Sequence, residues 1–269
     1  MNNNFGKYDL KQFYKDLDEL HIVLSDLQVE QFLSYYEMLI EKNKIMNLTA
    51  ITEYNEVLKK HFIDSLSLVK AYDLGGNIAV NNKSGYDDSG ESVQNCSDNA
   101  FNISLIDIGT GGGFPGIPLK IAFPNLKVTL MDSLNKRVDF LREVIEELGL
   151  DGIDTIHGRA EDYAKPGQLR EQYDVCVSRA VANLSVLSEY CLPYVKIGGR
   201  FISYKSEKIT EEMKDAEHAI RILGGRIKEQ VSFTLPDSDL YRNLFMIEKY
   251  VPTPAKYPRK AGMASKKPL

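Results

Sequence analysis

The sequence predicts an α/β protein with a mostly parallel, doubly wound sheet. From residue 104 onward, short apolar strands alternate with segments of helical periodicity. A glycine-rich turn stands between the first of these strands and the helix that follows it. The 269 residues suffice for one such domain with an appendage. We expect a helical cap over residues 1–74, a flexible polar linker over 75–102, the sheet domain over 103–252 and a basic tail over 253–269.

The N-terminal region, residues 7–73, is predicted to be helical. Ser25 and Gln28 have the spacing of a capping box. One apolar stripe follows at helical spacing, and further helices are expected over 54–61 and 64–72. The stripe comprises Val29, Phe32, Leu33, Tyr36, Leu39 and Ile40. The next stretch, 75–102, is rich in Gly, Asn, Ser and Asp, so it has too few large apolar residues to order itself.

The sheet is predicted to have seven strands, five of them parallel and two forming a closing antiparallel pair. The parallel strands are expected over 104–108, 127–131, 153–157, 173–178 and 199–204, and the antiparallel pair over 226–233 and 241–250. Helices are expected over 118–123, 138–148, 183–192 and 209–223.

Composition narrows the functional classes. The net charge is −5, yet the tail carries a local basic run, and phosphate binding needs a local basic face rather than a basic average. This run comprises Lys256, Arg259, Lys260, Lys266 and Lys267. Three cysteines without metal-ligand spacing indicate neither a disulfide framework nor a metal site and favour a reducing cytoplasm. The chain contains no long apolar run, so neither a membrane partner nor a secretory signal is expected.

The glycine-rich turn is the strongest functional signal. It reads Asp107-Ile-Gly109-Thr-Gly111-Gly-Gly113-Phe114-Pro-Gly116. Glycines permit a tight turn and a close approach of backbone to ligand, and the helix that follows presents free N–H groups. Asp132 ends the second strand, where a carboxylate would accept hydrogen bonds from a ribose diol. These features predict an adenosine-containing ligand, either NAD or S-adenosylmethionine.

Two further details favour S-adenosylmethionine. Asp107 stands ahead of the first glycine, where it can hold the turn near a cationic ligand. Ala160 and Glu161 follow the third strand, at a place suited to the adenine edge. A pyrophosphate ligand requires neither feature, and no hydride-acceptor constellation follows later in the sequence.

The chain resembles the glucose-inhibited division protein B family, the 16S rRNA (guanine-N7) methyltransferases G. The resemblance lies in Asp132-Ser-Leu-Asn-Lys-Arg137 and in four further motifs that occur in the same order. They are Asn43-Lys-Ile-Met-Asn47-Leu-Thr49, His61-Phe-Ile-Asp64-Ser65, Ser178-Arg179-Ala180 and Tyr257-Pro-Arg259-Lys260-Ala-Gly262. The resemblance implies a class I S-adenosylmethionine-dependent methyltransferase with a helical cap. It also implies 16S ribosomal RNA, or the small ribosomal subunit, as partner.

The resemblance carries cofactor contacts over to Gly109, Phe114, Ala160, Glu161 and Arg179. The turn and the ribose argument add Gly111, Gly113 and Asp132 to this set. Guanine N7 bears an exposed lone pair, so methylation there needs no general base and depends on in-line positioning.

An arginine is suited to bind guanine O6. Arg179 is the first choice for this role at the reaction centre and Arg137 the second, while Lys205 is a candidate contact to RNA. The alternatives are a methyltransferase for a protein or small molecule, an NAD-dependent oxidoreductase, and a non-catalytic RNA-binding module.

Overall fold

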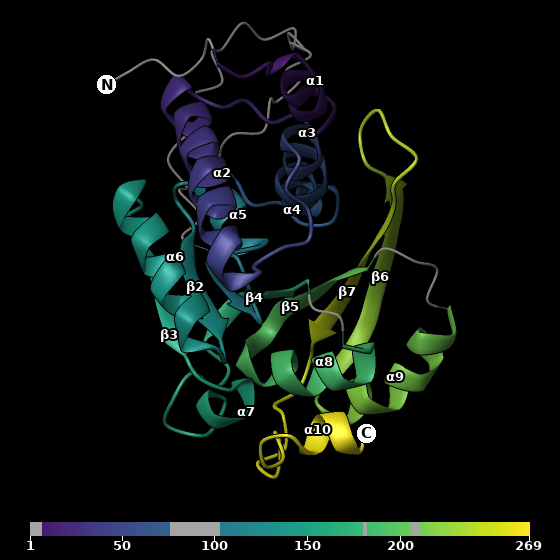
Figure 1. Cartoon of the computed structure of the whole chain (residues 1–269). Coiled ribbons are helices and arrows are strands. Elements are labelled where there is room, and N and C mark those ends of the chain that lie inside the picture. The colour runs from purple at the N-terminus through teal and green to yellow at the C-terminus, as the bar shows by residue number, and fades with distance from the viewer. Residues whose placement is uncertain (1–6, 76–102, 180–181, 206–209) are drawn as a thin grey trace, which may run out of the picture.

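The computed structural model describes residues 7–75, 103–179, 182–205 and 210–269 (Figure 1). Its centre is a seven-stranded sheet in the order β3-β2-β1-β4-β5-β7-β6. Strands β1 to β5 run parallel, and β7 is antiparallel to both of its neighbours, β5 and β6. The predicted fold class and strand number are therefore confirmed. The strands are β1 (Ser104–Ile108), β2 (Lys127–Asp132), β3 (Ile153–His157), β4 (Tyr173–Ser178), β5 (Val195–Lys205), β6 (Gly225–Thr234) and β7 (Tyr241–Lys249).

Helices cover both faces of the sheet, which explains why the parallel strands are nearly continuous apolar runs. Successive residues of one strand belong to different cores: Leu105 packs with the cap, α5 and α6, whereas Ile106 packs with α8 and α9. Figure 1 shows the cap helices and α8–α9 on opposite sides of the sheet. The helices that follow β1 along the chain are α5 (Gly116–Ala122), α6 (Asn135–Glu147), α7 (Ala160–Tyr163), α8 (Leu184–Cys191), η4 (Leu192–Tyr194), α9 (Thr210–Ile222) and α10 (Met263–Lys266).

The cap begins with α1 (Lys11–Glu19) and α2 (Asp26–Met46). The capping box of α2 is confirmed, because the Ser25 side chain accepts from the Gln28 N–H while the Gln28 side chain accepts from the Ser25 N–H. The predicted stripe is confirmed, since all six of its residues lie in the core or pack against it, but it omits Tyr35. Tyr35 is fully buried and Tyr36 only partly so, since the Tyr35 hydroxyl donates to the carbonyl of Gly112 in the glycine-rich turn.

The rest of the cap is one continuous helical run instead of the two helices expected. Phe62 and Ile63 fill the predicted gap; both are fully buried, and neither is a residue that stops a helix. The run changes its winding along its length. It consists of α3 (Tyr54–Val57), the π-helical turn η2 (Leu58–Ile63), α4 (Asp64–Leu66) and the 3-10 turn η3 (Ser67–Lys70). The predicted linker beyond Gly75 lies outside the described residues.

Candidate functional site

The glycine-rich turn leaves the carboxyl end of β1, where ligands of open α/β sheets bind. Gly109, Gly111 and Gly113 have φ values of 74°, 62° and 105°, a region that side chains avoid. A Cβ on Gly113 would lie 2.6 Å from the Tyr35 hydroxyl, whereas one on Gly111 would meet nothing within 4 Å. Gly113 therefore serves packing, and Gly111 leaves room above the turn.

A cavity of about 330 Å³ lies beside this turn, within the range of small-molecule sites. Four predicted cofactor residues line it: Gly109, Asp132, Ala160 and Glu161. The structure thus brings together the ends of β1 and β2 and the start of α7. The remaining lining residues are Ile108, Met131, Ser133, Gly158, Arg159, Tyr190, Gly262 and Ser265.

Asp132 joins the turn to the end of β2. Its side chain is 3% exposed, Oδ2 accepts from the Gly111 N–H at 2.9 Å, and Oδ1 accepts from the Leu134 N–H at 2.9 Å. Nη1 of Arg137 lies 3.4 Å from Oδ2. A carboxylate has about four lone-pair positions, so these contacts leave capacity for a hydroxyl donor from the cavity. The ribose contact of Asp132 stays a prediction that this geometry accommodates.

Asp107 supports the turn from within. Its Oδ2 accepts from the Thr110 hydroxyl at 2.7 Å and from the Gly116 N–H at 2.9 Å. Complete burial raises the pKa of this carboxyl to about 6. Its Oδ1 is buried without a hydrogen-bond partner among the described residues. Asp107 does not itself line the cavity, so its carboxylate would favour a cationic ligand through electrostatic attraction across the turn and not through a direct contact.

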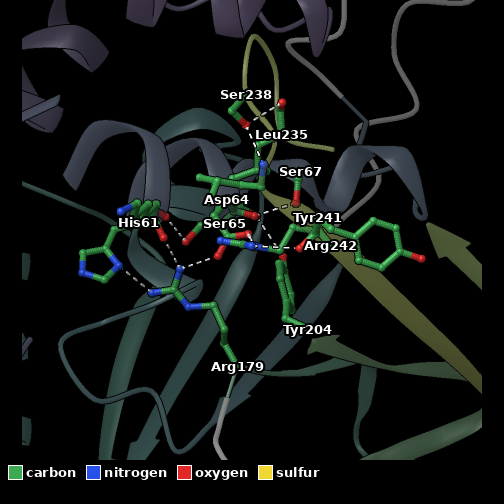
Figure 2. Close-up of polar contacts among 12 residues, drawn as sticks. His61, Asp64, Ser65, Ser67, Arg179, Tyr204, Leu235, Ser238, Tyr241 and Arg242 are labelled. Atoms are coloured by element: carbon green, nitrogen blue, oxygen red, sulfur yellow. Dashed lines mark hydrogen bonds and ion pairs between the residues drawn. The ribbon is translucent and has the colours of Figure 1, made fainter. Parts of the chain in front are cut away.

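Arg179, directly after β4, lies among cap residues and does not line the cavity (Figure 2). Its Nη1 donates to the Lys60 carbonyl at 3.1 Å and to Oδ2 of Asp64 at 3.0 Å, and Nη2 donates to Nδ1 of His61 at 3.2 Å. Arg242 of β7 donates to the other oxygen of Asp64 at 2.7 Å. One carboxylate thus joins the cap to β4 and β7.

His61 is held in its neutral form by this arrangement. Because Arg179 donates to Nδ1, the ring proton resides on Nε2, which lies 2.7 Å from the Thr49 hydroxyl. Burial, followed by the charge of Arg179, lowers the pKa of His61 to about 3. The Asn43 side chain holds Thr49 in place: its Oδ1 accepts from the Thr49 N–H at 2.8 Å, and its Nδ2 donates to the Thr49 carbonyl at 2.9 Å. The cap motifs noted in the sequence therefore meet around one arginine.

Phe114 belongs to the same cluster. Its ring stacks on His61 at a centroid distance of 4.6 Å, and the Arg179 guanidinium lies 5.0 Å from its centroid. The side chain is 6% exposed and does not line the cavity. The structure thus separates Phe114 and Arg179 from the four predicted residues at the cavity, and their cofactor contact stays a prediction.

The two candidates for substrate contact differ in availability. The Arg137 side chain is 36% exposed, and it contacts Asp132, which lines the cavity. Lys205 is 12% exposed, and its ammonium contacts the Ala182 carbonyl and a Glu212 carboxylate oxygen, both at 2.8 Å. An RNA contact by Lys205 would require this ion pair to open.

The prediction from sequence missed the part of the site that the C-terminal segment forms. Gly262 and Ser265 line the cavity, and the Gly262 N–H donates to Glu161 at 2.7 Å. Arg259, predicted as part of a basic tail, pairs at 2.6 Å with Glu189, whose side chain is 1% exposed. The available signal was the motif at 257–262, which supplies a glycine with φ of 81°.

No described helix is long and apolar enough to cross a membrane. Within the same residues, no group of three or more His, Cys, Asp or Glu side chains is placed to hold a metal ion.

Comparison with known proteins decides the family. The family model described as rRNA small subunit methyltransferase G, GidB, matches residues 28–81 and 88–241. The chain belongs to this family. A relative from Lachnoclostridium phytofermentans, named ribosomal RNA small subunit methyltransferase G, is 51% identical over 97% of this chain and 98% of its own length. One of the same name from Alkaliphilus metalliredigens is 49% identical over 96% of this chain and 98% of its own length.

Solved structures show a weaker likeness. M. jannaschii TYW2, solved in complex with AdoMet, is 16% identical and covers 55% of this chain and 69% of its own, with a TM-score of 0.45. The fold assignment rests on the strand order and on the family. Family membership and the strand order together identify the sheet, with its antiparallel β7, as the class I methyltransferase fold. The cofactor of this family is S-adenosylmethionine. The oxidoreductase alternative is set aside.

Proposed function

We propose that this protein transfers the methyl group of S-adenosylmethionine to N7 of a guanine in 16S ribosomal RNA. The observation that carries the proposal is the similarity, over nearly the whole chain, to relatives named ribosomal RNA small subunit methyltransferase G. The cavity beside the glycine-rich turn supports it, because its residues fit an adenosine ligand. The partner is 16S ribosomal RNA or the small ribosomal subunit, and the protein acts in the cytoplasm.

The cofactor supplies an electrophilic methyl group on a cationic sulfur. This chain's residues would hold the cofactor: Asp132 would accept hydrogen bonds from the ribose, Gly111 would leave space for it, and Asp107 would provide negative charge under the turn. The N7 lone pair needs no proton removed, so the enzyme's contribution is alignment. We assign no general base.

Arg179 is our candidate for orienting the guanine, with Arg137 as second choice. A guanidinium has five N–H donors, and contacts with Lys60, Asp64 and His61 occupy three of those of Arg179. In this proposal, the other two, which have no hydrogen-bond partner among the described residues, would donate to a base or a cofactor carboxylate. In this proposal, residues 1–74 act as a cap that holds Arg179 in position, and 103–252 form the methyltransferase domain.

Small subunits from a strain that lacks this methylation provide the test. After incubation with the enzyme and S-adenosylmethionine, we expect one guanine of 16S ribosomal RNA to become N7-methylguanine, mapped by cleavage at the modified base. Methyl transfer to protein, or to another atom of the RNA, would disprove the assignment. With saturating cofactor, the single-turnover rate should not depend on pH between about 7 and 9, whereas a unit slope would reveal a general base.

A further inference from the structure

The C-terminal segment, residues 253–269, is fastened to the fold at its start. Arg170 donates to the carbonyls of Thr253, Pro254 and Tyr257. The Thr253 N–H donates to Glu171 at 2.7 Å, and its hydroxyl accepts from the buried ammonium of Lys249 at 2.6 Å. Figure 1 shows the segment, in yellow, passing from the end of β7 to α10 beneath α8. The segment is therefore part of the folded domain.

Arg259 fixes the next part of the segment. Its Nε lies 2.9 Å from Oε1 of Glu189 and its Nη2 lies 2.6 Å from Oε2, so the pair is bidentate. The Arg259 backbone N–H adds a third bond to Oε1 at 2.8 Å. Glu189 is on α8 with 1% of its side chain exposed, and that of Arg259 is 21% exposed. A guanidinium committed in this way is poorly available to a phosphate.

Beyond Arg259, the segment forms one side of the cavity. The Gly262 N–H donates to Glu161, and the Ser265 hydroxyl lies 2.7 Å from that of Tyr190. All four of these residues line the cavity. Four neighbouring lysines are exposed and do not line the cavity: Lys256, Lys260, Lys266 and Lys267. The segment thus has an inner side that contacts the cavity and an outer basic side.

We propose that residues 262–265 form a wall of the S-adenosylmethionine site and that Arg259 is a positioning residue, acting through Glu189, which keeps this wall closed. The inference rests on the proposed cofactor cavity. Loss of the guanidinium would leave the Glu189 carboxylate buried without its ion-pair partner, so the segment would move away from α8 to admit water. Gly262 would then lose its fixed place opposite Glu161, and the cofactor would dissociate faster.

The test uses Arg259→Gln, with Lys260→Gln as its matched control, since Lys260 is the adjacent exposed residue with the same charge. S-adenosylhomocysteine binding is measured by calorimetry without RNA, and its dissociation by stopped flow. For Arg259→Gln we expect at least tenfold weaker binding, mostly through faster dissociation, and faster hydrogen exchange of the Gly262 amide. Lys260→Gln should bind within twofold of wild type. Arg259→Lys, which keeps the charge but not the bidentate geometry, should be intermediate.

A second variant covers failure of the first to fold. Glu189→Gln combined with Arg259→Gln replaces the ion pair with two neutral amides, leaving no unpaired buried charge, and should also weaken S-adenosylhomocysteine binding. A folded Arg259→Gln or double variant that binds and releases S-adenosylhomocysteine as wild type does would overturn the proposal. If wild type itself binds no S-adenosylhomocysteine, the proposed function fails as well. Wild-type cofactor binding with unmethylated RNA would count against the proposed function alone.

Discussion

The Asp64 carboxylate gives the sharpest prediction about what holds the cap in place. Asp64→Asn preserves the shape of the side chain and removes its charge. In the native protein, Oδ2 lies 3.0 Å from Arg179 and Oδ1 lies 2.7 Å from Arg242. The side chains of the three residues are 7%, 17% and 15% exposed, respectively, so the charges are shielded from water. The substitution leaves two guanidinium groups close together without a shared counter-ion.

The expected cost follows from this burial. Breaking a buried ion pair from one side costs about 3–5 kcal/mol. Because both arginines keep some exposure and Arg179 keeps its bond to the Lys60 carbonyl, we expect about 3 kcal/mol of unfolding free energy to be lost. For a chain of this size, that corresponds to a fall in Tm of roughly 6–12 °C.

Urea denaturation followed by circular dichroism measures this loss, with Asp139→Asn as the control. Asp139 also pairs with an arginine at 3.0 Å, but its side chain is 49% exposed and that of Arg142 55%. An exposed pair of this kind contributes about 0.5 kcal/mol or less. Equal effects of the two substitutions would refute the argument that the shared, buried position of Asp64 decides its contribution.

Three further predictions follow from the turn and from the two perturbed groups beside it. Gly111→Ala should weaken S-adenosylmethionine binding at least tenfold, as measured by calorimetry, since its Cβ would occupy the open space above the turn. Gly149→Ala is the control, because Gly149 has a φ of 59° and equally open space around it. It should cost similar stability and leave binding unchanged. The pKa of Asp107, raised to about 6 by burial, predicts that S-adenosylmethionine affinity falls as pH drops through 6, because the neutral carboxyl no longer attracts the cation; Asp107→Asn should bind weakly at pH 8 and lose this dependence. The pKa of His61, lowered to about 3 from an unfolded value of 6.5, means that the unfolded chain takes up a proton first as pH falls. Wild type should therefore lose about 1.4 kcal/mol of stability per pH unit below 6.5 relative to His61→Gln. If the urea midpoints of the two proteins changed equally between pH 7 and pH 5, this prediction would be wrong.

The sheet was predictable from the sequence because its central strands are buried on both faces. Runs such as 104–108 and 173–178 are apolar and end at glycine or polar residues, so their type and limits are visible locally. The cavity residues at the ends of β1 and β2 were predictable for the same reason, since the carboxyl ends of parallel strands share one edge.

Features that depend on distant contacts were not predictable. The helical stripe of α2 does not reveal that Tyr35 is fully buried, because the partner of its hydroxyl is the Gly112 carbonyl, 77 residues away. The basic composition of the tail does not reveal that Arg259 faces a buried glutamate 70 residues earlier. The separation of Phe114 and Arg179 from the cavity likewise depends on His61 and Asp64 in the cap.

The bond from Tyr35 to the glycine-rich turn has a consequence for how much of this protein can exist by itself. A fragment that starts at β1 would keep every strand of the sheet. It would lose the hydroxyl that holds the Gly112 carbonyl, the rings that cover Phe114, and the carboxylate that pairs with Arg179. We therefore expect a fragment that starts at β1 to be less stable than the whole chain, because residues 7–75 support the glycine-rich turn from outside the sheet.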